Sequence, residues 1–352
     1  MANALFNISS NGSSNTQNAL TWKVVPNELT MAMFIIFFIL IVCGNIWVMI
    51  AVVRQPKLRK SSTCMFIISL SFSDLMMAFF YIPMQMAYVG FGLTGMSSVV
   101  LCKGSAWLQW VAQCATIFSL IGIGIDRYRA IVQPLHPKLT RTDAAVCITV
   151  TWICAGAYSS HRMYVLDIVT FTYPVGFNVT VSTSVCAVPS DKYYLLSYLE
   201  VGDFLVMYLV PLIIICVMYA IMVSSLWFSS APNDESKKRK RKSVKMLILV
   251  VVLFCISWLP WRCFSLYFQL TNFASIPVNI FIWSDVIAAI CITLYLTNSW
   301  VNPFLYAYFN QHFRKEFYRL FPCMLKRQSK VVPTNTPNVN IIASNSVNAT
   351  LS

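Results

Sequence analysis

The chain of 352 residues is predicted to be an all-α membrane protein, a bundle of seven transmembrane helices followed by a short amphipathic helix at the membrane interface. Two observations predict this fold. Hydrophobic residues make up 58% of the chain and charged residues only 11%, too little charge to cover a soluble fold of this size. Long stretches such as 29–53, 104–125 and 286–313 also contain no charged residue, and a membrane-spanning helix needs ~20 apolar residues.

Two of the expected spans contain an isolated ionisable residue. The second span carries Asp74, and the sixth, beyond its basic end, carries Arg262. Ionisable side chains are costly inside a bilayer, so both residues are candidates for a functional role. The seven spans are expected at residues 30–53, 62–88, 100–133, 145–167, 194–226, 240–270 and 278–308.

The basic residues predict how the bundle is oriented. Most of the 26 lysines and arginines lie in four clusters, at 54–60, 127–141, 237–245 and 314–330, and a seven-span topology places all four on one side. Positively charged loops stay in the cytoplasm, so the N-terminus is expected outside the cell, the C-terminus inside, and the protein in the plasma membrane. The net charge of +14 then reflects topology and attraction to anionic lipid, and not nucleic-acid binding.

Glycosylation sequons support this orientation, because those at Asn7, Asn11 and Asn178 all fall on the predicted outer side. A fourth sequon, at Asn348, lies in the predicted cytoplasmic tail and is interpreted as a chance match. The expected organisation is a disordered, glycosylated segment at 1–27, the bundle at 28–308, an interfacial helix at 309–323 and a disordered tail at 324–352.

Two of the twelve cysteines are expected to be both outside the cell and beyond the membrane core. These are Cys102, at the outer end of the third span, and Cys186, in the loop before the fifth. The outside is oxidising, so we expect a Cys102–Cys186 disulfide that ties the loop 168–193 across the mouth of the bundle. Two free thiols are the alternative.

Phenylalanines four residues apart predict the interfacial helix. Phe309, Phe313 and Phe317 lie on one helical face, with basic residues between them. Cys323 follows this helix and is placed for S-palmitoylation. An unmodified cysteine is the alternative.

A series of motifs runs through the spans in a fixed order. Asp126-Arg127-Tyr128 stands at the inner end of the third span, and Asn302-Pro303-Phe304-Leu305-Tyr306 near the end of the seventh. Together with the other motifs at matching spacings, these resemble the rhodopsin-like (class A) G protein-coupled receptors, from the first span to the segment after the seventh. The other motifs are Gly44-Asn45, Leu70 to Asp74, Trp152, Pro211, Tyr219, Phe254, Trp258 and Pro260.

Polar residues from several spans are expected to gather around Asp74. The resemblance implies that they hold a hydrated sodium ion. A water-filled polar core without an ion is the alternative, and no other cofactor is expected. The candidate residues are Asn45, Thr116, Asn298, Ser299 and Asn302.

Arg127 can pair with Asp126 while the bundle is closed. The resemblance implies that Arg127 turns toward a heterotrimeric G protein when the sixth span moves outward, with Tyr219 and Tyr306 beside it. Many members of this family carry an acid at the base of the sixth span, but this chain has Lys240 there, so a lock between that span and Arg127 is expected to be missing or different.

Pro260 is expected to kink the sixth span and to make it a lever, because proline removes a backbone hydrogen bond. The resemblance assigns the packing that links the ligand cavity to this lever to Ile117, Pro211, Phe254 and Trp258.

The ligand is expected between the outer halves of the third, fifth, sixth and seventh spans. Gln109 stands where amine receptors carry an aspartate, and Leu296 where opsins carry the retinal lysine, so neither ligand is favoured. The fourth span has Ser160-His161-Arg162 in place of the proline common near its outer end, so the outer cavity is expected to differ from that of other members.

Glu200 and Asp203 lie on one face of the fifth span. One interpretation is a buried pair between Asp203 and Arg262. The other is that the acids bind a cationic ligand group while Arg262 binds a carboxylate or an amide. The complete set of candidate ligand-binding residues is Gln109, Gln113, Glu200, Asp203, Trp258 and Arg262.

Local sequence details favour a short peptide as the ligand. The segments His136 to Thr140 and Val244 to Leu247 resemble receptors for neuropeptide FF and related peptides. Asn298-Ser299 in the seventh span and the acids of the fifth also resemble amine receptors, so a biogenic amine or another small polar ligand is the alternative. The resemblance further implies arrestin and receptor kinases as partners.

Two other classes of protein are disfavoured. A transporter or channel would need repeated halves or an ion pathway through the bundle, and the sequence shows no internal repeat. An enzyme would need a nucleophile, a phosphate-binding loop or a metal-ligand cluster. The three histidines, His136, His161 and His312, are far apart in sequence and topology.

Overall fold

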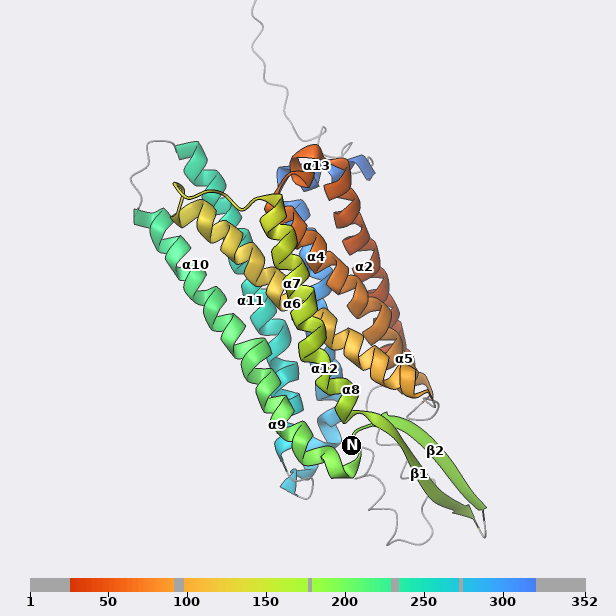
Figure 1. Ribbon diagram of the computed structural model, residues 1–352. Coiled ribbons are helices and arrows are strands. Elements are labelled where there is room, and N and C mark those ends of the chain that lie inside the picture. Colours follow the sequence, from red (N-terminus) through yellow and green to blue (C-terminus); the bar gives the residue numbers. More distant parts are fainter. Residues whose placement is uncertain (1–25, 92–97, 177–178, 229–233, 272–274, 321–352) are drawn as a thin grey trace, which may run out of the picture.

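The computed structural model describes residues 26–91, 98–176, 179–228, 234–271 and 275–320. It is a bundle of long helices that run side by side, with a β-hairpin projecting from one end and the short helix α13 lying across the other (Figure 1). We refer to these as the hairpin end and the α13 end.

The expected spans correspond to seven helical segments, some of which are divided. The first four are α2 (Asn27–Arg54), α4 to α5 (Ser62–Met76 and Ile82–Phe91), α6 (Val99–Val132) and α7 with α8 (Arg141–Ser159 and His161–Val165). The last three are α9 to α10 (Tyr193–Phe204 and Val210–Phe228), α11 (Asp234–Leu270) and α12 (Val278–Phe309). Short helical turns, α3 (Pro56–Arg59) and η3 (Ser190–Lys192), and α13 (Gln311–Leu320) complete the helices of the described residues.

Six of the described helices are long and apolar enough to cross a membrane. α7 is shorter, and it packs against α6 and α4 as the seventh member of the bundle. Apolar side chains such as Ile36, Val146 and Ile213 are exposed on the outside of the bundle, whereas polar ones such as Asn45 and Asp74 are buried inside it. This distribution is the one that a hydrocarbon solvent requires.

A π-helical turn precedes a proline in two of the spans. The turn η2 (Met77–Tyr81) lies before Pro83, and η4 (Leu205–Leu209) lies before Pro211. Proline cannot donate a hydrogen bond to the carbonyl four residues earlier, and a wider turn accommodates the interruption without ending the helix.

The fourth span begins at Arg141, four residues before the expected start, because Thr140 and Asp143 form a capping box. The Thr140 hydroxyl accepts from the Asp143 backbone N–H at 3.1 Å, and the Thr140 N–H donates to the Asp143 carboxylate at 2.9 Å. This reciprocal pair satisfies two backbone donors at the start of the helix.

The loop expected at 168–193 before the fifth span contains regular structure. It forms an antiparallel hairpin of β1 (Asp167–Gly176) and β2 (Val179–Ala187), in which Ile168 lies opposite Cys186. Alternating valine and threonine or serine in β2 is the signal that predicts such a strand. The expected disulfide between Cys102 and Cys186 is confirmed, and it ties β2 to the start of α6.

An ion pair strengthens the same junction, because Lys103 Nζ lies 3.3 Å from the Asp167 carboxylate. The Ile168 backbone N–H donates to this carboxylate at 2.9 Å. This hydrogen bond and the Lys103 ammonium hold the pKa of Asp167 below its usual range. The base of the hairpin is therefore attached to the bundle by a covalent bond and by charge.

The helix α13 begins at Gln311, two residues after the start of the expected helix 309–323. Phe309 is the last residue of α12, and residues 321–323 lie outside the described residues. Phe313 is fully buried, with its ring 6.1 Å from that of Trp47 and 5.7 Å from that of Tyr306. The apolar face of α13 therefore packs on α2 and α12, and part of that face is covered by protein.

The contact between α4 and α6 depends on the absence of a side chain at Gly122. A Cβ atom there would lie 2.5 Å from the Phe66 ring, closer than real Cβ contacts allow. We expect Gly122→Ala to destabilise the protein by about 1–3 kcal/mol, because the α4–α6 contact must open to admit the methyl group. The measurement is the melting temperature of the purified, detergent-solubilised protein.

Gly104→Ala in the same helix is the matched control. A Cβ atom at Gly104 meets nothing within 4 Å, so the variant should be unchanged or gain up to about 1 kcal/mol from helix propensity. Equal melting temperatures for the two variants would contradict this account of the α4–α6 contact.

Candidate functional site

At the α13 end, the side chains of Asp126 and Arg127 are held by the start of α4. The buried Asp126 carboxylate accepts from the Ser62 hydroxyl at 2.7 Å and from the Thr63 hydroxyl. Arg127 Nη2 lies 3.1 Å from Asp126 Oδ2 and also hydrogen-bonds to Thr63. The expected Asp126–Arg127 pair is therefore present, and it is joined to the second span.

The contact of Asp126 and Arg127 with the second span was not predicted from the sequence. The sequence predicted only that a lock between Arg127 and the sixth span, where Lys240 lies, is missing or different. The side chain of Lys240 lies outside the described residues. Thr63 and Ser62 are the residues that sequence reasoning missed, although their position at the start of a span places hydroxyls at the membrane boundary. Tyr128, the third residue of the motif, is half-buried and packs against the apolar core.

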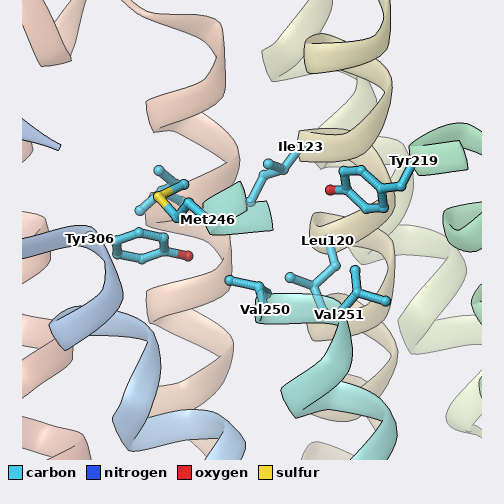
Figure 2. Close-up of a pocket in the computed structure, with 8 residues that line it drawn as sticks. Leu120, Ile123, Tyr219, Met246, Val250, Val251 and Tyr306 are labelled. Carbon is cyan, nitrogen blue, oxygen red and sulfur yellow. The ribbon is translucent and has the colours of Figure 1, made fainter. Parts of the chain in front are cut away.

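An apolar crevice lies between the helices near this ionic pair (Figure 2). In Figure 2, Tyr219 and Tyr306 lie on opposite sides of the crevice, with Val250 and Val251 of α11 between them. Both tyrosines are buried. The crevice is lined by Ile67, Leu120, Ile123, Tyr219, Met246, Val250, Val251 and Tyr306.

In the middle of the bundle, the Asp74 carboxylate has no solvent exposure. The polar side chains of Ser299 and Asn302 interact with it, but neither carboxylate oxygen accepts a hydrogen bond of regular geometry. Thr116 is buried close by and hydrogen-bonds to Ser73, the neighbour of Asp74, at 2.8 Å. The carboxylate therefore keeps free oxygen acceptors in a polar, buried setting.

The other polar residues expected near Asp74 are also buried. Asn45 Nδ2 donates to the backbone carbonyls of Ile41 at 3.0 Å and of Ser299 at 3.1 Å, which ties α2 to α12. Asn298 and Asn302 are both less than 5% exposed. The fold thus gathers the expected polar cluster from α2, α4, α6 and α12.

A row of aromatic rings crosses the bundle between this cluster and the hairpin end. The ring centroids are 5.8 Å apart for Tyr208 and Phe254, 5.0 Å for Phe254 and Trp258, and 5.1 Å for Trp258 and Tyr295. Tyr295 in turn lies 5.8 Å from Tyr81 of η2. The row therefore connects the fifth, sixth, seventh and second spans by direct ring contact.

Of the residues expected to link ligand and lever, Phe254 and Trp258 belong to this row, and all four are buried. Ile117 and Phe254 have no solvent exposure, Pro211 is buried, and Trp258 is 3% exposed. Close packing of this kind transmits small displacements, because a packed interior has discrete arrangements and does not deform smoothly.

At the hairpin end, the acids of the fifth span pair with Arg162 of α8. Arg162 Nη2 lies 2.9 Å from Glu200 Oε1 and forms a closer ion pair with Asp203 Oδ2. The Tyr158 hydroxyl donates to Asp203 Oδ1 at 2.7 Å, and His161 Nε2 lies 3.5 Å from Asp203 Oδ2. The guanidinium of Arg162 also lies 3.7 Å from the Trp110 ring centroid.

The suggested pair between Asp203 and Arg262 is therefore wrong, because Asp203 is bound to Arg162. Arg262 instead donates from Nη2 to the Gln113 side-chain oxygen at 3.0 Å, and it is 4% exposed. Arg162 was recognisable in the sequence only as part of the unusual Ser160-His161-Arg162 segment. Of the other expected ligand-binding residues, Gln113 and Trp258 are buried beside Arg262, and Gln109 is half-buried on α6.

Several predicted modification sites are outside the described residues, namely Asn7, Asn11, Asn178 and Cys323. The same is true of residues 1–25 and 324–352, which hold most of the expected N-terminal segment and all of the expected tail.

Comparison with known proteins agrees with this architecture. Residues 44–306 match the rhodopsin family of seven-transmembrane receptors. The chain is 30% identical to the galanin receptor 2a of Danio rerio over 312 residues, which cover 87% of this chain and 81% of that receptor. It is 31% identical to the neuropeptide FF receptor 2 of Rattus norvegicus over 314 residues, covering 84% and 72% of the two chains.

A third relative is the substance-P receptor of Rattus norvegicus, 28% identical over 331 residues that cover 90% of this chain and 76% of the relative. The match of the whole bundle confirms the expectation of a multi-pass receptor of the plasma membrane, and it excludes the enzyme, transporter and channel interpretations. The chain belongs to the rhodopsin family of seven-transmembrane receptors.

Proposed function

We propose that this receptor binds a short peptide at the hairpin end and activates a heterotrimeric G protein at the α13 end. The aromatic row from Tyr208 through Trp258 to Tyr81 carries this proposal, because it links the polar site at the hairpin end to the spans that surround the crevice at the other end. The relatives are named as receptors for galanin, neuropeptide FF and substance P, which supports a peptide as the ligand.

The proposed orientation places the hairpin end and the N-terminus outside the cell. The disulfide between Cys102 and Cys186 is at the hairpin end and needs an oxidising compartment. The basic residues that follow α2, α6, α10 and α12 are at the α13 end, as expected for the cytoplasmic side. Glycans at Asn7, Asn11 and Asn178, and a lipid at Cys323, are part of the same proposal.

Activation begins where the ligand displaces Trp258, the ring of the aromatic row nearest to Arg262 in α11. Phe254 moves with Trp258, because the two rings are in contact one turn apart. The α13 end of α11 then swings away from α6, which opens the crevice between Tyr219 and Tyr306. Arg127 leaves Asp126 and contacts the G protein in the opened crevice. Asp126 and Tyr128, its neighbours in α6, take part in the same contact.

The residues around Asp74 fit a sodium ion in this proposal. Asp74, Thr116, Asn298 and Ser299 offer oxygen atoms, and both Asp74 carboxylate oxygens are buried without an ordinary hydrogen bond. A bound cation would neutralise the carboxylate, whose burial as an unpaired charge is costly.

The alternative of an amine receptor loses its main support. Glu200 and Asp203 were the candidate partners of a cationic ligand, but both are bound by Arg162. Arrestin and receptor kinases are further proposed partners, at the α13 end and the C-terminal segment.

Removing the Thr63 hydroxyl tests the contact that holds Arg127. We expect Thr63→Val to raise ligand-independent signalling about tenfold, because the closed state loses hydrogen bonds to both charged side chains. The measurement is GTPγS binding to a co-expressed G protein, normalised to surface abundance. Thr142→Val, an exposed threonine of α7, is the matched control, and equal basal signalling in both variants would contradict the role of Thr63.

The same variant provides a ligand-free test of Arg127. Adding Arg127→Ala to Thr63→Val should return signalling to background without loss of surface abundance, because the group that contacts the G protein is gone. Arg129→Ala, two residues further along α6, is the control and should leave the raised signalling largely intact. Persistent signalling by the first double variant would show that Arg127 is not needed.

Sodium binding is tested without a ligand. The melting temperature of the purified receptor should be higher in sodium chloride than in choline chloride at equal ionic strength, because a ligand of the native state stabilises it. Asp74→Asn should remove this difference, and Asp285→Asn, at an exposed acid of α12, should retain it. A sodium effect that survives in Asp74→Asn would place the ion elsewhere.

A further inference from the structure

We propose that Arg262 is the anion-binding residue of the ligand site, and that the activating ligand places a carboxylate against its guanidinium between α6 and α11. This inference rests on the proposed receptor function and adds the chemical class of the group that the ligand presents. A peptide can supply the carboxylate from its C-terminus or from an acidic side chain.

Arg262 is buried without a counter-charge among the described residues. It is 4% exposed, and among the described residues no carboxylate lies within ion-pair distance of it. Its Nη2 donates to the neutral Gln113 side chain, and its Nε is shielded from solvent with no acceptor. A guanidinium has five N–H donors, so this one keeps donors that no described residue accepts.

The acids of the neighbouring helix do not supply the missing charge. Glu200 and Asp203 are both bound to Arg162, and Asp203 also receives the Tyr158 hydroxyl and faces His161. The ion-pair partners of both carboxylates in this cluster therefore come from the α8 side, and Arg262 is not one of them.

The aromatic rings around Arg262 favour the binding of an anion to its guanidinium. The Trp110 ring lies 5.0 Å from the Arg262 guanidinium and 3.7 Å from that of Arg162, and the Trp258 ring lies 5.6 Å from Arg262. Aromatic faces attract a cation but offer its N–H groups no strong acceptor. Two guanidinium groups on one tryptophan repel each other, and a carboxylate beside Arg262 would relieve that repulsion and accept its free donors.

Polar side chains lead from the hairpin end toward Arg262. Gln109 is half-buried on α6, one turn nearer that end than Gln113. Ser265 and Gln269, which follow Arg262 along α11, hydrogen-bond to Glu200 at 3.4 Å and to Ser197 at 3.1 Å. An amide of the peptide next to the bound carboxylate meets Gln109. The carboxylate itself lies one turn from Trp258, which is in the middle of the aromatic row.

The first test uses the receptor without ligand. Arg262→Gln in the purified full-length protein should leave the melting temperature unchanged or raise it, because an uncompensated buried charge is removed and glutamine can still reach Gln113. Arg162→Gln, a similarly buried arginine with two carboxylate partners, should lower the melting temperature by about 5 °C or more. An equal loss in both variants would show that Arg262 is structural and would overturn the proposal.

The second test uses pools of short peptides in three matched forms: with a free C-terminal carboxylate, with a C-terminal amide, and with an amide together with Asn and Gln in place of Asp and Glu. The wild-type receptor should respond to forms that keep a carboxylate. Arg262→Gln should lower the potency of the active peptide about 30-fold or more, Arg262→Lys should lower it less, and Lys192→Gln should leave it unchanged. The form that loses activity identifies the source of the carboxylate.

The outcomes separate the two proposals. Equal activation of the wild-type receptor by the uncharged form would overturn the role of Arg262 and leave the peptide receptor standing. Activation by none of the forms would contradict the peptide ligand, and the melting comparison would then decide whether Arg262 lacks a structural partner.

Discussion

The cost of placing a charge in the hydrocarbon core of a membrane is the constraint on which this structure depends. Each ionisable side chain inside the bundle must find a partner, and the partners decide which helices are joined. Arg162 joins the fourth span to the fifth through Glu200 and Asp203. At the other end, Asp126 and Arg127 join the third span to Thr63 of the second. These two ionic clusters bracket the apolar aromatic row.

Two buried charges of the described residues, Asp74 and Arg262, have no partner of opposite charge, and we propose an ion for the first and a ligand for the second. Asp74 keeps free carboxylate oxygens in the polar centre of the bundle, and Arg262 keeps free N–H donors beside Trp258. An incompletely satisfied charge is an energetic liability in the empty receptor. The same energetic cost favours the binding of an ion or ligand group of opposite charge, because that group forms the interaction that no protein side chain provides.

Much of the fold could be predicted from the sequence because a bilayer makes hydrophobicity decisive. Charge-free stretches located the spans, and the two cysteines outside the membrane core paired as expected. The π-helical turns, the hairpin and the capping box at Thr140 depend on local hydrogen bonds that span length does not reveal. Many residues of the candidate site were predictable, but Thr63 and Arg162 were not, and neither was the pairing. The spacing of Glu200 and Asp203 along the fifth span places both on one helical face. Only the packing of that span against the fourth and sixth spans decides whether Arg162 or Arg262 is the partner of Asp203.

Asp203 is bound to Arg162, whereas Arg262 has no carboxylate partner among the described residues. A double-mutant cycle on the melting temperature of the purified receptor tests this pairing most directly. Arg162→Gln and Asp203→Asn should each destabilise the protein, and the double variant should lose clearly less than the sum of the two. The cycle of Arg262→Gln with Asp203→Asn should be additive. Coupling in the second cycle, or additivity in the first, would contradict the account.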